Sequence, residues 1–422
     1  MTERTSSRVR RSFPAAIVLG LLLAAAVPGA EPQWLHWGGP NRDFTSPTKG
    51  LAASWPEAGP KVLWRRELGD GYAAIVVDGD QLFTMIRRGD DDVVVALETG
   101  TGKTIWEMEY AAPIASNFRP GFAPGPHSTP AIAGDRIFTV GGFLHFHALD
   151  KASGEILWSH DLVAEMGITP PGRGYAPSPL VYRDLVILTP GGEEKAVIAF
   201  RQDTGEVAWK SQSFGSTYSS PVLAIVDGEE QIIVAMGPER AGLDPRTGEL
   251  RWCLTVREEA STVFSTQLWG AEDHLLFGSS AYADGSRVIR IAKQDGKFVA
   301  EELWYNRKMR IHHGNAIRIG DYVYGSSGDF GPAFLMAVNV HTGEVAFRQR
   351  GFAKANFLHV DGKLIILDEE GDLAIATPSP EGIEVHARAH VLGPTSWTVP
   401  TLVGTRLFVR NREEIVALDM GS

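Results

Sequence analysis

The chain has 422 residues, a formal net charge of −11 at pH 7, and 44% hydrophobic against 22% charged residues. This balance is typical of a soluble globular protein with a large core, and without a basic run it argues against nucleic acid as a partner. The single cysteine, Cys253, excludes an intramolecular disulfide. Because it lies beside Trp252, we expect a thiol packed in the core.

The first 30 residues have the pattern of an export signal. The basic segment Arg8–Arg11 precedes the apolar run Ala15–Val27, and Gly29-Ala30 offers a cleavage site. A membrane anchor is disfavoured because the run is shorter than the ~20 residues of a spanning helix. The paired arginines permit the twin-arginine route, although the Sec route is favoured. We therefore expect a periplasmic or otherwise exported protein without a transmembrane anchor after cleavage.

Residues 31–60 are predicted to form an N-terminal strap. Its segment Gln33–Arg42 (QWLHWGGPNR) is rich in Trp and Gly and has no strand periodicity. We expect it to pack across the surface of the folded body. The next segment, Lys61–Leu68, has the pattern of the last strand of a repeat that lacks its beginning.

One sequence frame then recurs along the chain. It has a small residue, an apolar residue, usually an acid, then Thr/Ser-Gly, and an aromatic residue ten positions after the start. Clear copies are Ala96–Trp106, Ala148–Trp158, Ala199–Trp209, Gly242–Trp252 and Ala337–Phe347. Recurrence at about 40–50 residues is the signature of a propeller or solenoid.

Each part of the frame has a physical role. Thr/Ser-Gly closes a tight hairpin whose glycine takes a positive φ, and the acid accepts hydrogen bonds from backbone N–H groups of the turn. The aromatic residue lies on the next strand, where its face can cover a neighbouring unit, and the small residue leaves room for the ring. The predicted docking residues are Trp64, Trp106, Trp158, Trp209, Trp252 and Trp304.

The units can be counted from these frames. A fifth unit lacks the Thr-Gly turn but ends at Trp304, and a weak seventh extends from Ala355 to about Ala389. Units open on Ser/Thr-Pro segments such as Ser178-Pro179. The last unit begins a frame at Ile415 but lacks its turn and its tryptophan. If this strand pairs with the strand around Trp64, the ring closes without a free sheet edge. We predict an all-β fold, an eight-bladed β-propeller of four-stranded antiparallel blades, as one domain over residues 61–422. Seven blades are the alternative.

The frame A-x-D-x-x-T-G-x-x-x-W resembles the tryptophan-docking motif of pyrroloquinoline-quinone (PQQ) repeat propellers. The resemblance covers roughly residues 60–420, and the plan from the Trp-rich strap onward is similar to that of exported BamB-like propellers. It implies an eight-bladed propeller outside the cytoplasm. It does not imply an enzyme, because the same repeats build quinoprotein dehydrogenases and non-catalytic scaffolds.

The enzymatic branch of this family implies a vicinal disulfide beside the quinone and a Ca²⁺ site with a catalytic Asp. One cysteine cannot make that disulfide, and Ca²⁺ needs six or more oxygen ligands. The acids Asp329, Glu193 and Glu194 all fall in predicted loops, where a solvated charge is the default. We therefore favour loss of catalysis and assign no catalytic or metal-binding residue.

Segments that lead into the innermost strands of a propeller share one face, where ligands commonly bind. Here these segments are rich in polar and aromatic residues. The predicted channel-mouth residues are Arg119, His127, Tyr175, Tyr218, Arg310, His312, His313, Lys354 and Trp397. The cations suit an anionic ligand such as a carboxylated quinone, and Trp397 or a Tyr could stack on a flat ring. We favour a polar channel whose side chains bind backbone and water over a small-molecule site.

The pair His312-His313 is not expected to bind a metal, because adjacent residues of a regular strand point to opposite faces. We predict one ring in the channel and the other in the blade. The run Gly100–Thr104 looks like part of a nucleotide loop, but it lacks the first glycine at Walker spacing and falls on a repeat turn.

Two functional hypotheses follow. The first is an exported monomeric scaffold that binds a protein partner, or a small ligand at its channel. The alternative is a PQQ-dependent oxidoreductase, with Ca²⁺, acting on an alcohol or sugar; the chemistry would then belong to the cofactor.

Overall fold

The computed structural model describes residues 33–119, 123–256, 267–282, 284–329 and 332–422. The predicted export signal at residues 1–30 lies outside them. Within the described residues no helix is both long and apolar enough to cross a bilayer. The one α-helix, α1 (Leu162–Met166), is a single short turn capped by the carboxylate of Asp161.

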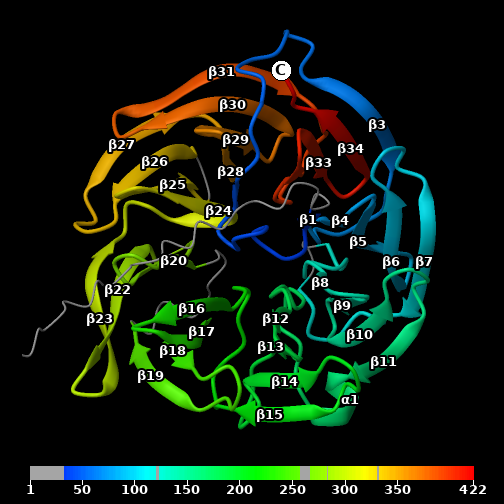
Figure 1. Ribbon diagram of the computed structural model, residues 1–422, viewed down its shortest axis with the longest axis vertical. Helices are drawn as coiled ribbons and strands as arrows, with labels where there is room; N and C mark the ends of the chain where they lie inside the picture. The colour runs from blue at the N-terminus through cyan, green and yellow to red at the C-terminus, as the bar shows by residue number, and fades with distance from the viewer. Residues whose placement is uncertain (1–32, 120–122, 257–266, 283, 330–331) are drawn as a thin grey trace, which may run out of the picture. The chain divides into compact units, whose positions relative to one another are not determined.

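Eight sheets, each with a blade of four antiparallel strands, follow one another around a common centre (Figure 1). Blade 1 consists of β4 (Val76–Asp78), β5 (Gln81–Arg88), β6 (Asp91–Glu98) and β7 (Thr104–Ala111), and blade 2 of β8 (Ala131–Ala133), β9 (Arg136–Val140), β10 (His145–Asp150) and β11 (Ile156–Asp161). Blade 3 consists of β12 (Leu180–Tyr182), β13 (Leu185–Leu188), β14 (Val197–Arg201) and β15 (Val207–Ser211). Blade 4 consists of β16 (Val222–Val226), β17 (Glu229–Met236), β18 (Glu239–Leu243) and β19 (Leu250–Thr255).

Blade 5 consists of β20 (Leu268–Gly270), β21 (Leu275–Ser279), β22 (Ser286–Gln294) and β23 (Lys297–Asn306). Blade 6 consists of β24 (Ile311–Ile319), β25 (Tyr322–Ser327), β26 (Phe334–Asn339) and β27 (Val345–Arg350). Blade 7 consists of β28 (Asn356–Val360), β29 (Lys363–Leu367), β30 (Asp372–Ser379) and β31 (Gly382–His390). The prediction of eight four-stranded blades is confirmed, including the weak seventh unit.

The two ends of the chain build the eighth blade together. β32 (Thr401–Val403), β33 (Arg406–Arg410) and β34 (Glu414–Asp419) are followed outward by β3 (Lys61–Glu67) from the start of the propeller. β3 and β34 pair antiparallel, with Trp64 opposite Ala417, in the register that the split frame predicts. The ring is therefore closed by backbone hydrogen bonds, and no blade has to be completed by another chain.

The frame residues join neighbouring blades along the outer rim. The ring of Trp158 in blade 2 lies against the turn of blade 3, and its Nε1 donates to the carbonyl of Gln202 at 3.0 Å. In that turn Gly205 has φ +74°, and a Cβ there would lie 2.7 Å from the indole. The same contacts recur at other joints, where the donor–acceptor pairs are Trp64–Thr99, Trp106–Lys151 and Trp304–Val340.

The joint between blades 4 and 5 departs from this pattern. Blade 5 has no Thr-Gly turn to receive an indole, and Trp252 Nε1 instead donates to Gln231 Oε1 in its own blade at 2.8 Å. The rotated ring lies over Gly242, where a Cβ would meet Nε1 at 2.1 Å. Glycine therefore replaces the usual alanine of the frame because the ring occupies its space. The joint of blades 3 and 4 keeps the ring contact but not the hydrogen bond. The ring of Trp209 contacts Gly248, but its buried Nε1 has no partner among the described residues.

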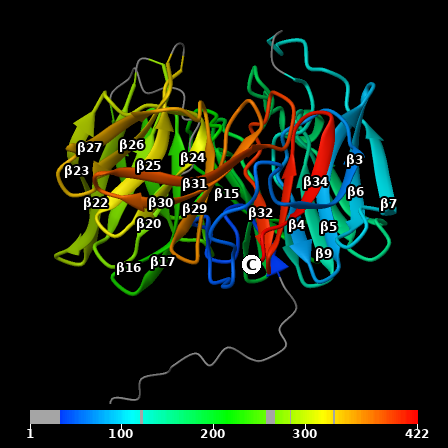
Figure 2. The same ribbon diagram turned by 90° about the horizontal axis from the view of Figure 1, so that it is seen from above.

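The N-terminal strap crosses one face of the ring at the end of the channel. β1 (Gln33–Trp34) pairs with β4 of blade 1, and β2 (Thr45–Ser46) pairs with β28 of blade 7. Between them the chain reaches blade 3, where Arg42 Nη2 donates to the carbonyl of Val181 at 3.0 Å. Trp34 and Phe44 are buried. The strap therefore packs across the folded body, as expected, and buries these two rings because they need an apolar environment (Figure 2, strap in blue).

Cys253 also differs from expectation. It lies on β19, the outermost strand of blade 4, and is exposed. Side chains alternate along a strand, so the inward-facing Trp252 places its neighbour on the solvent side.

Candidate functional site

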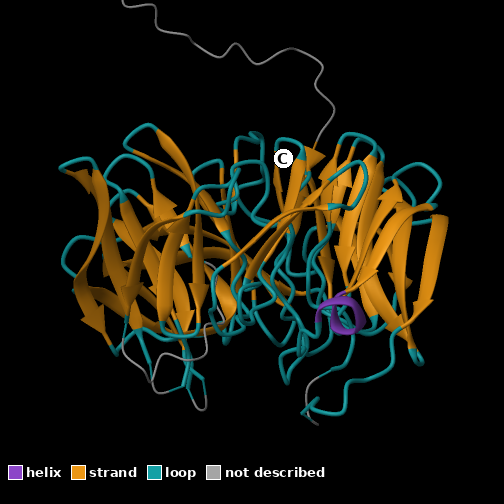
Figure 3. Ribbon diagram, turned by 90° about the horizontal axis from the view of Figure 1, so that it is seen from below, coloured by secondary structure: helices purple, strands orange, loops and turns teal. Residues whose placement is uncertain are grey.

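The segments that lead into the innermost strands gather on one face of the ring. Every blade begins at its innermost strand, so each connection from an outermost strand returns to the channel on this face. Helix α1 lies among these connections (Figure 3). The strap occupies the opposite face (Figure 2). A ligand would therefore reach the channel from the face that carries the connections.

Hydroxyl side chains fasten consecutive blades at this face. The backbone N–H of Ala74 in blade 1 donates to Thr129 Oγ1 at 3.2 Å. Thr129 N–H donates to Ser178 Oγ at 3.1 Å, and Ser178 N–H donates to Ser220 Oγ at 2.9 Å. Each hydroxyl belongs to the segment that opens the following blade. The Ser/Thr-Pro openings seen in the sequence thus form a row of inter-blade hydrogen bonds, which we call the hydroxyl latches (Thr129, Ser178, Ser220).

Other blades are joined at the hub by different side chains. Asn315 of blade 6 exchanges hydrogen bonds with the backbone of Phe357 in blade 7, at 2.9 and 2.8 Å. At the joint of blades 8 and 1, the fully buried guanidinium of Arg410 donates to the carbonyls of Met85 and Gly71, at 2.8 and 2.9 Å. Burial lowers the pKa of Arg410 to about 9, which leaves it charged at neutral pH.

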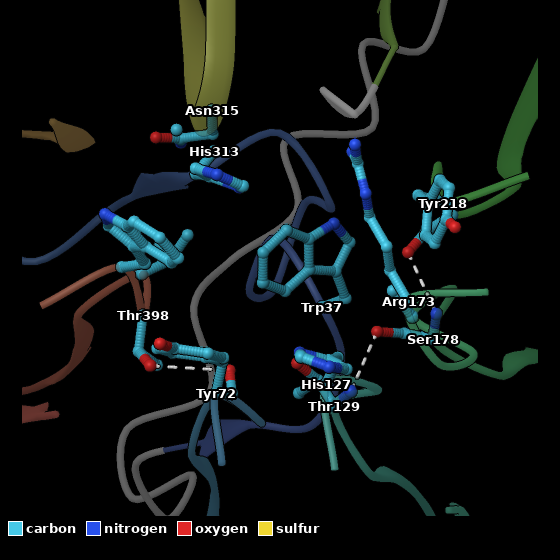
Figure 4. Close-up of a pocket in the computed structure, with 15 residues that line it drawn as sticks. Trp37, Tyr72, His127, Thr129, Arg173, Ser178, Tyr218, His313, Asn315 and Thr398 are labelled. Carbon is cyan, nitrogen blue, oxygen red and sulfur yellow. Dashed lines mark hydrogen bonds between the residues drawn. The ribbon is translucent and has the colours of Figure 1, made fainter. Parts of the chain in front are cut away.

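A pocket of about 140 Å³ lies in the hub between these joints (Figure 4). It is bounded by segments of blades 1 to 4, 6 and 8 and by Trp37 of the strap. The lining residues are Trp37, Tyr72, His127, Thr129, Arg173, Ala176, Ser178, Tyr218, Ser220, His313, Gly314, Asn315, Trp397, Thr398 and Val399. None of these described lining residues is Asp or Glu.

One side of the pocket is a wall of stacked rings. His313 stacks on Trp397 with centroids 4.0 Å apart, and Tyr72 lies 5.3 Å from Trp397 and 5.5 Å from His127. Behind the wall, Glu369 accepts hydrogen bonds from Trp397 Nε1 at 3.1 Å and from the ammonium of Lys354 at 2.7 Å. The Lys354 ammonium also lies 5.4 Å from the Trp397 ring, so the indole is held from both its edge and its face.

The two adjacent histidines lie on the same side, contrary to the prediction that they would point to opposite faces. Their ring centroids are 3.7 Å apart. The pairing of β24 with β25 shifts register between Ile311 and Ala316, and this irregularity breaks the strand alternation. His313 lines the pocket, while the buried His312 lies behind it with Nε2 2.9 Å from the hydroxyl of Tyr282.

The histidines of the hub are neutral at pH 7. Burial lowers the pKa of His127 to about 4. Burial, reinforced by the charge of Lys354, lowers that of His312 to about 4 and that of His313 well below its ordinary value. The described lining therefore carries one formal positive charge at pH 7, on the guanidinium of Arg173.

Donors face the ring wall from the other side. Arg173, on the connection between blades 2 and 3, reaches across the hub, and its Nη1 donates to the hydroxyl of Tyr282 at 3.2 Å. Tyr218 lines the pocket beside it (Figure 4), and burial raises the pKa of that phenol. The latch hydroxyls complete this side.

The structure brings together part of the predicted site. His127, Tyr218, His313 and Trp397 line the pocket, and His312 and Lys354 form its second layer. Arg310 instead pairs with Asp329 at 3.4 Å and donates to the carbonyl of Tyr282.

Two predicted residues lie elsewhere. Arg119 is exposed. Tyr175 is fully buried in blade 3 with its hydroxyl accepting from Thr189 N–H, so neither ring face nor hydroxyl reaches the pocket.

Sequence reasoning missed Tyr72, Arg173 and Trp37, which line the pocket. Tyr72 precedes the first complete unit and could have been found by extending the search for entering segments to blade 1. Arg173 is recognisable only from the course of its loop across the hub. Trp37 is a pocket residue because the strap crosses the end of the channel.

The lining does not fit PQQ with Ca²⁺. Ca²⁺ requires oxygen ligands that normally include carboxylates, and the described lining has none. No group of three or more His, Cys, Asp or Glu side chains within the described ranges is arranged to hold a metal. The exposed Cys253 on the outermost strand of blade 4 is not at the pocket.

Comparison with known proteins gives a consistent family. A family model described as outer membrane protein assembly factor BamB matches residues 90–349, more than half of the chain. The BamB protein of Yersinia pestis is 23% identical over 301 residues, 68% of this chain and 72% of that protein. The BamB protein of Shewanella oneidensis is 22% identical over 290 residues, 63% and 67% of the two chains.

Solved structures share the fold. BamB from Moraxella catarrhalis aligns with a TM-score of 0.58 and 17% identity over 85% of this chain and 99% of that one. Quinohemoprotein alcohol dehydrogenase from Comamonas testosteroni aligns with a TM-score of 0.63 and 13% identity, over 93% and 81%. At such identities the likeness concerns the fold alone, and it does not separate scaffold from enzyme.

Proposed function

The chain belongs to the family of outer membrane protein assembly factor BamB, and from this we propose that it is an exported scaffold that binds proteins engaged in outer membrane assembly. One observation carries the proposal: the family match extends through the repeats, from within blade 1 to blade 6. It therefore concerns the whole surface-forming body rather than a local motif.

The construction of the ring supports this role. Successive blades are joined at the rim by docked indoles and at the hub by side-chain hydrogen bonds. Because the blades are joined both at the rim and at the hub, the ring is rigid and its surface keeps a fixed shape. A rigid surface lowers the entropic cost of binding a partner.

We expect the partner to bind the face that carries the blade-to-blade connections. Their described parts are long, and the connection after blade 1 exposes Ile114 with 49% of its surface accessible. An exposed apolar side chain on a protruding loop is a common feature of protein contacts.

The test is capture of envelope proteins by the tagged, processed chain after cross-linking in intact cells of its own organism. We expect outer membrane assembly proteins to be enriched, and Ile114→Asp to reduce the enrichment several-fold. Ile225→Asp is the matched control, because Ile225 is exposed by 58% on β16, near the opposite face. Absence of any such protein from the captured set would overturn the proposal.

Export is tested separately. The mature chain recovered from the periplasmic fraction should begin close to Glu31 when sequenced from its N-terminus. A mature chain that begins at Met1 in the cytoplasmic fraction would contradict export.

A further inference from the structure

We propose that Arg348 and Arg350, on the outermost strand of blade 6, bind two carboxylates of an acidic, extended segment of a protein partner. This contact is additional to the one proposed at Ile114, and it does not depend on the partner being an outer membrane assembly protein.

The two arginines share one aromatic ring. They are two residues apart on β27, where such side chains point to the same side of the sheet, and both are exposed. The guanidinium carbon of Arg348 lies 3.6 Å, and that of Arg350 5.6 Å, from the centre of the Phe334 ring on β26. Arg350 lies directly opposite Phe334 in the pairing of these strands. The two cations are therefore no farther apart than the sum of those two distances.

Neither guanidinium pairs with a carboxylate of the described residues; the side-chain contacts of both are those with Phe334. At 3.6 Å the guanidinium of Arg348 stacks on the ring. A stacked guanidinium keeps its N–H groups, which lie in its own plane, for hydrogen bonds with another group. The ring thus holds the cations in place without using their donors.

Other arginines that lie over an aromatic ring do have a carboxylate partner. The guanidinium of Arg183 lies 5.2 Å from the Tyr182 ring and forms an ion pair with Glu230 at 2.8 Å. The same combination of ring, arginine and acid recurs in Tyr305, Arg287 and Glu302, in Phe352, Arg388 and Asp372, and in Phe143, Arg87 and Asp92. At Phe334 the described residues provide the ring and the cations but no acid. Carboxylates from another molecule would complete the arrangement.

The strand that carries the arginines is fixed from its other side. The side-chain amide of Gln349, between the two arginines, donates to the carbonyl of Ile383 in blade 7 and accepts the N–H of the same residue, both at 3.1 Å. Because β27 is already ordered, a partner pays little entropy to bind it. Arg350 ends β27, and the connection to blade 7 begins there, so the pair lies at the outer edge of the face that carries the connections (Figure 1).

The charges favour a protein segment over a membrane surface. Anionic bilayers are bound by clusters of about four to eight basic residues. Here two arginines lie on a chain whose formal net charge is −11, which an anionic bilayer repels.

The spacing of the cations indicates the form of the segment. In an extended chain, residues i and i+2 point to the same side and lie about 6.6 Å apart. This is shorter than the greatest separation that the two ring distances allow. Two Asp or Glu residues with one residue between them therefore suit the pair.

Binding of a short peptide to the full processed chain tests the proposal. The probe is Gly-Glu-Val-Glu-Gly with blocked ends, and the neutral analogue is Gly-Gln-Val-Gln-Gly; NMR of the peptide follows binding. We expect a Kd of about 1 mM for the acidic peptide and binding about tenfold weaker for the analogue. The affinity should fall severalfold when the salt concentration is raised from about 0.05 to about 0.5 M.

Substitutions then locate the site. The double variant Arg348→Gln, Arg350→Gln should bind the acidic peptide about tenfold more weakly. Arg183→Gln is the matched control and should leave the affinity unchanged, because Arg183 is an exposed arginine over a ring that already has Glu230. Reversal of both charges, with Arg348→Glu and Arg350→Glu, should shift the preference to Gly-Lys-Val-Lys-Gly. Thermal melting checks that each variant is folded.

Several results would overturn the proposal: no binding of the acidic peptide at about 10 mM, equal binding of the neutral analogue, or equal effects of the double variant and Arg183→Gln. Binding of the chain to phosphatidylglycerol vesicles that is lost in the double variant would assign the pair to a membrane instead. The peptide measurements involve no envelope protein, so this proposal and that of the scaffold fail separately.

Discussion

The outer rim and the hub of the ring both join each blade to the next, but they do so with different chemistry. The rim uses one repeated device, an indole against a glycine turn, as in Trp158 on Gly205. The hub uses hydroxyl latches between blades 1 and 4, an asparagine between blades 6 and 7, and a buried arginine between blades 8 and 1. The rim repeats this device at four joints, whereas the hub uses a different side chain from one group of joints to the next.

The largest expected effect is at the buried arginine of the hub. Arg410→Met would leave the carbonyls of Gly71 and Met85 without the guanidinium donor in a buried joint. We expect the free energy of unfolding to fall by about 3–5 kcal/mol. Urea titration followed by fluorescence measures it.

The control for Arg410 is Arg65→Met at the same closing blade. Arg65 pairs with Glu414 and donates to the carbonyl of Val391, with its side chain 45% exposed. An exposed pair contributes little, so we expect a change within about 1 kcal/mol. If both variants lost equal stability, the buried arginine would not be the fastening of this joint.

At the rim, Gly205→Ala tests the docking turn. Its Cβ would lie 2.7 Å from the Trp158 ring and would also have to take a positive φ. We expect a loss of about 2–3 kcal/mol in the free energy of unfolding. Gly134→Ala is the matched control, because Gly134 also has a positive φ but nothing within 4 Å of its Cβ. It should cost only the backbone strain, about 1 kcal/mol.

The effect of Gly205→Ala should shrink in a Trp158→Ala background, where the clash is removed. A double-mutant cycle measures the difference. Additive losses in this cycle would mean that the indole and the turn do not interact energetically.

The hub histidines predict a loss of stability in acid. The pKa of His127 is lowered to about 4 by burial, against about 6.5 in the unfolded chain, so below pH 6.5 the unfolded chain binds more protons. Each such histidine lowers the free energy of unfolding by about 1.4 kcal/mol per pH unit between pH 6.5 and about 4. His127→Asn should therefore flatten the curve by about one proton in this range.

The exposed His386→Asn serves as the control for that curve, since no hub contact involves it. Unfolding midpoints in urea between pH 4 and 7.5 measure the slope. A slope unchanged by His127→Asn would contradict a neutral, buried imidazole.

The smallest effect is expected at a latch. Ser178→Ala removes the acceptor of the buried N–H of Thr129 and should cost about 1–2 kcal/mol. Ser178→Thr keeps the hydroxyl and should recover most of this loss, as measured by urea titration. If the threonine variant were as unstable as the alanine variant, packing rather than the hydrogen bond would be responsible.

The rim could be predicted almost completely from the sequence because its devices are local. The turn, its glycine and its acid lie within one hairpin, and Asp150 accepts from Ser153 as expected, which lowers its pKa. The register of Trp64 opposite Ala417 followed from two halves of one frame. The orientation of Trp252 could not be predicted, because it depends on a turn that is missing in the next blade.

The hub was predicted only in part, because its contacts join residues that are far apart in the sequence. Four-stranded blades bring the entering segments to one face, and of the residues predicted there His127, Tyr218, His313 and Trp397 line one pocket.

The sequence alone therefore determined the number of blades, the closure of the ring and the rim, since period-two strands and tight turns are set by neighbouring residues. Only the tertiary structure decided that the strap crosses the end of the channel, that Arg173 reaches Tyr282 and that His313 stacks on Trp397. These contacts depend on the width of the channel and on one irregular strand, which are properties of the assembled ring rather than of any single repeat.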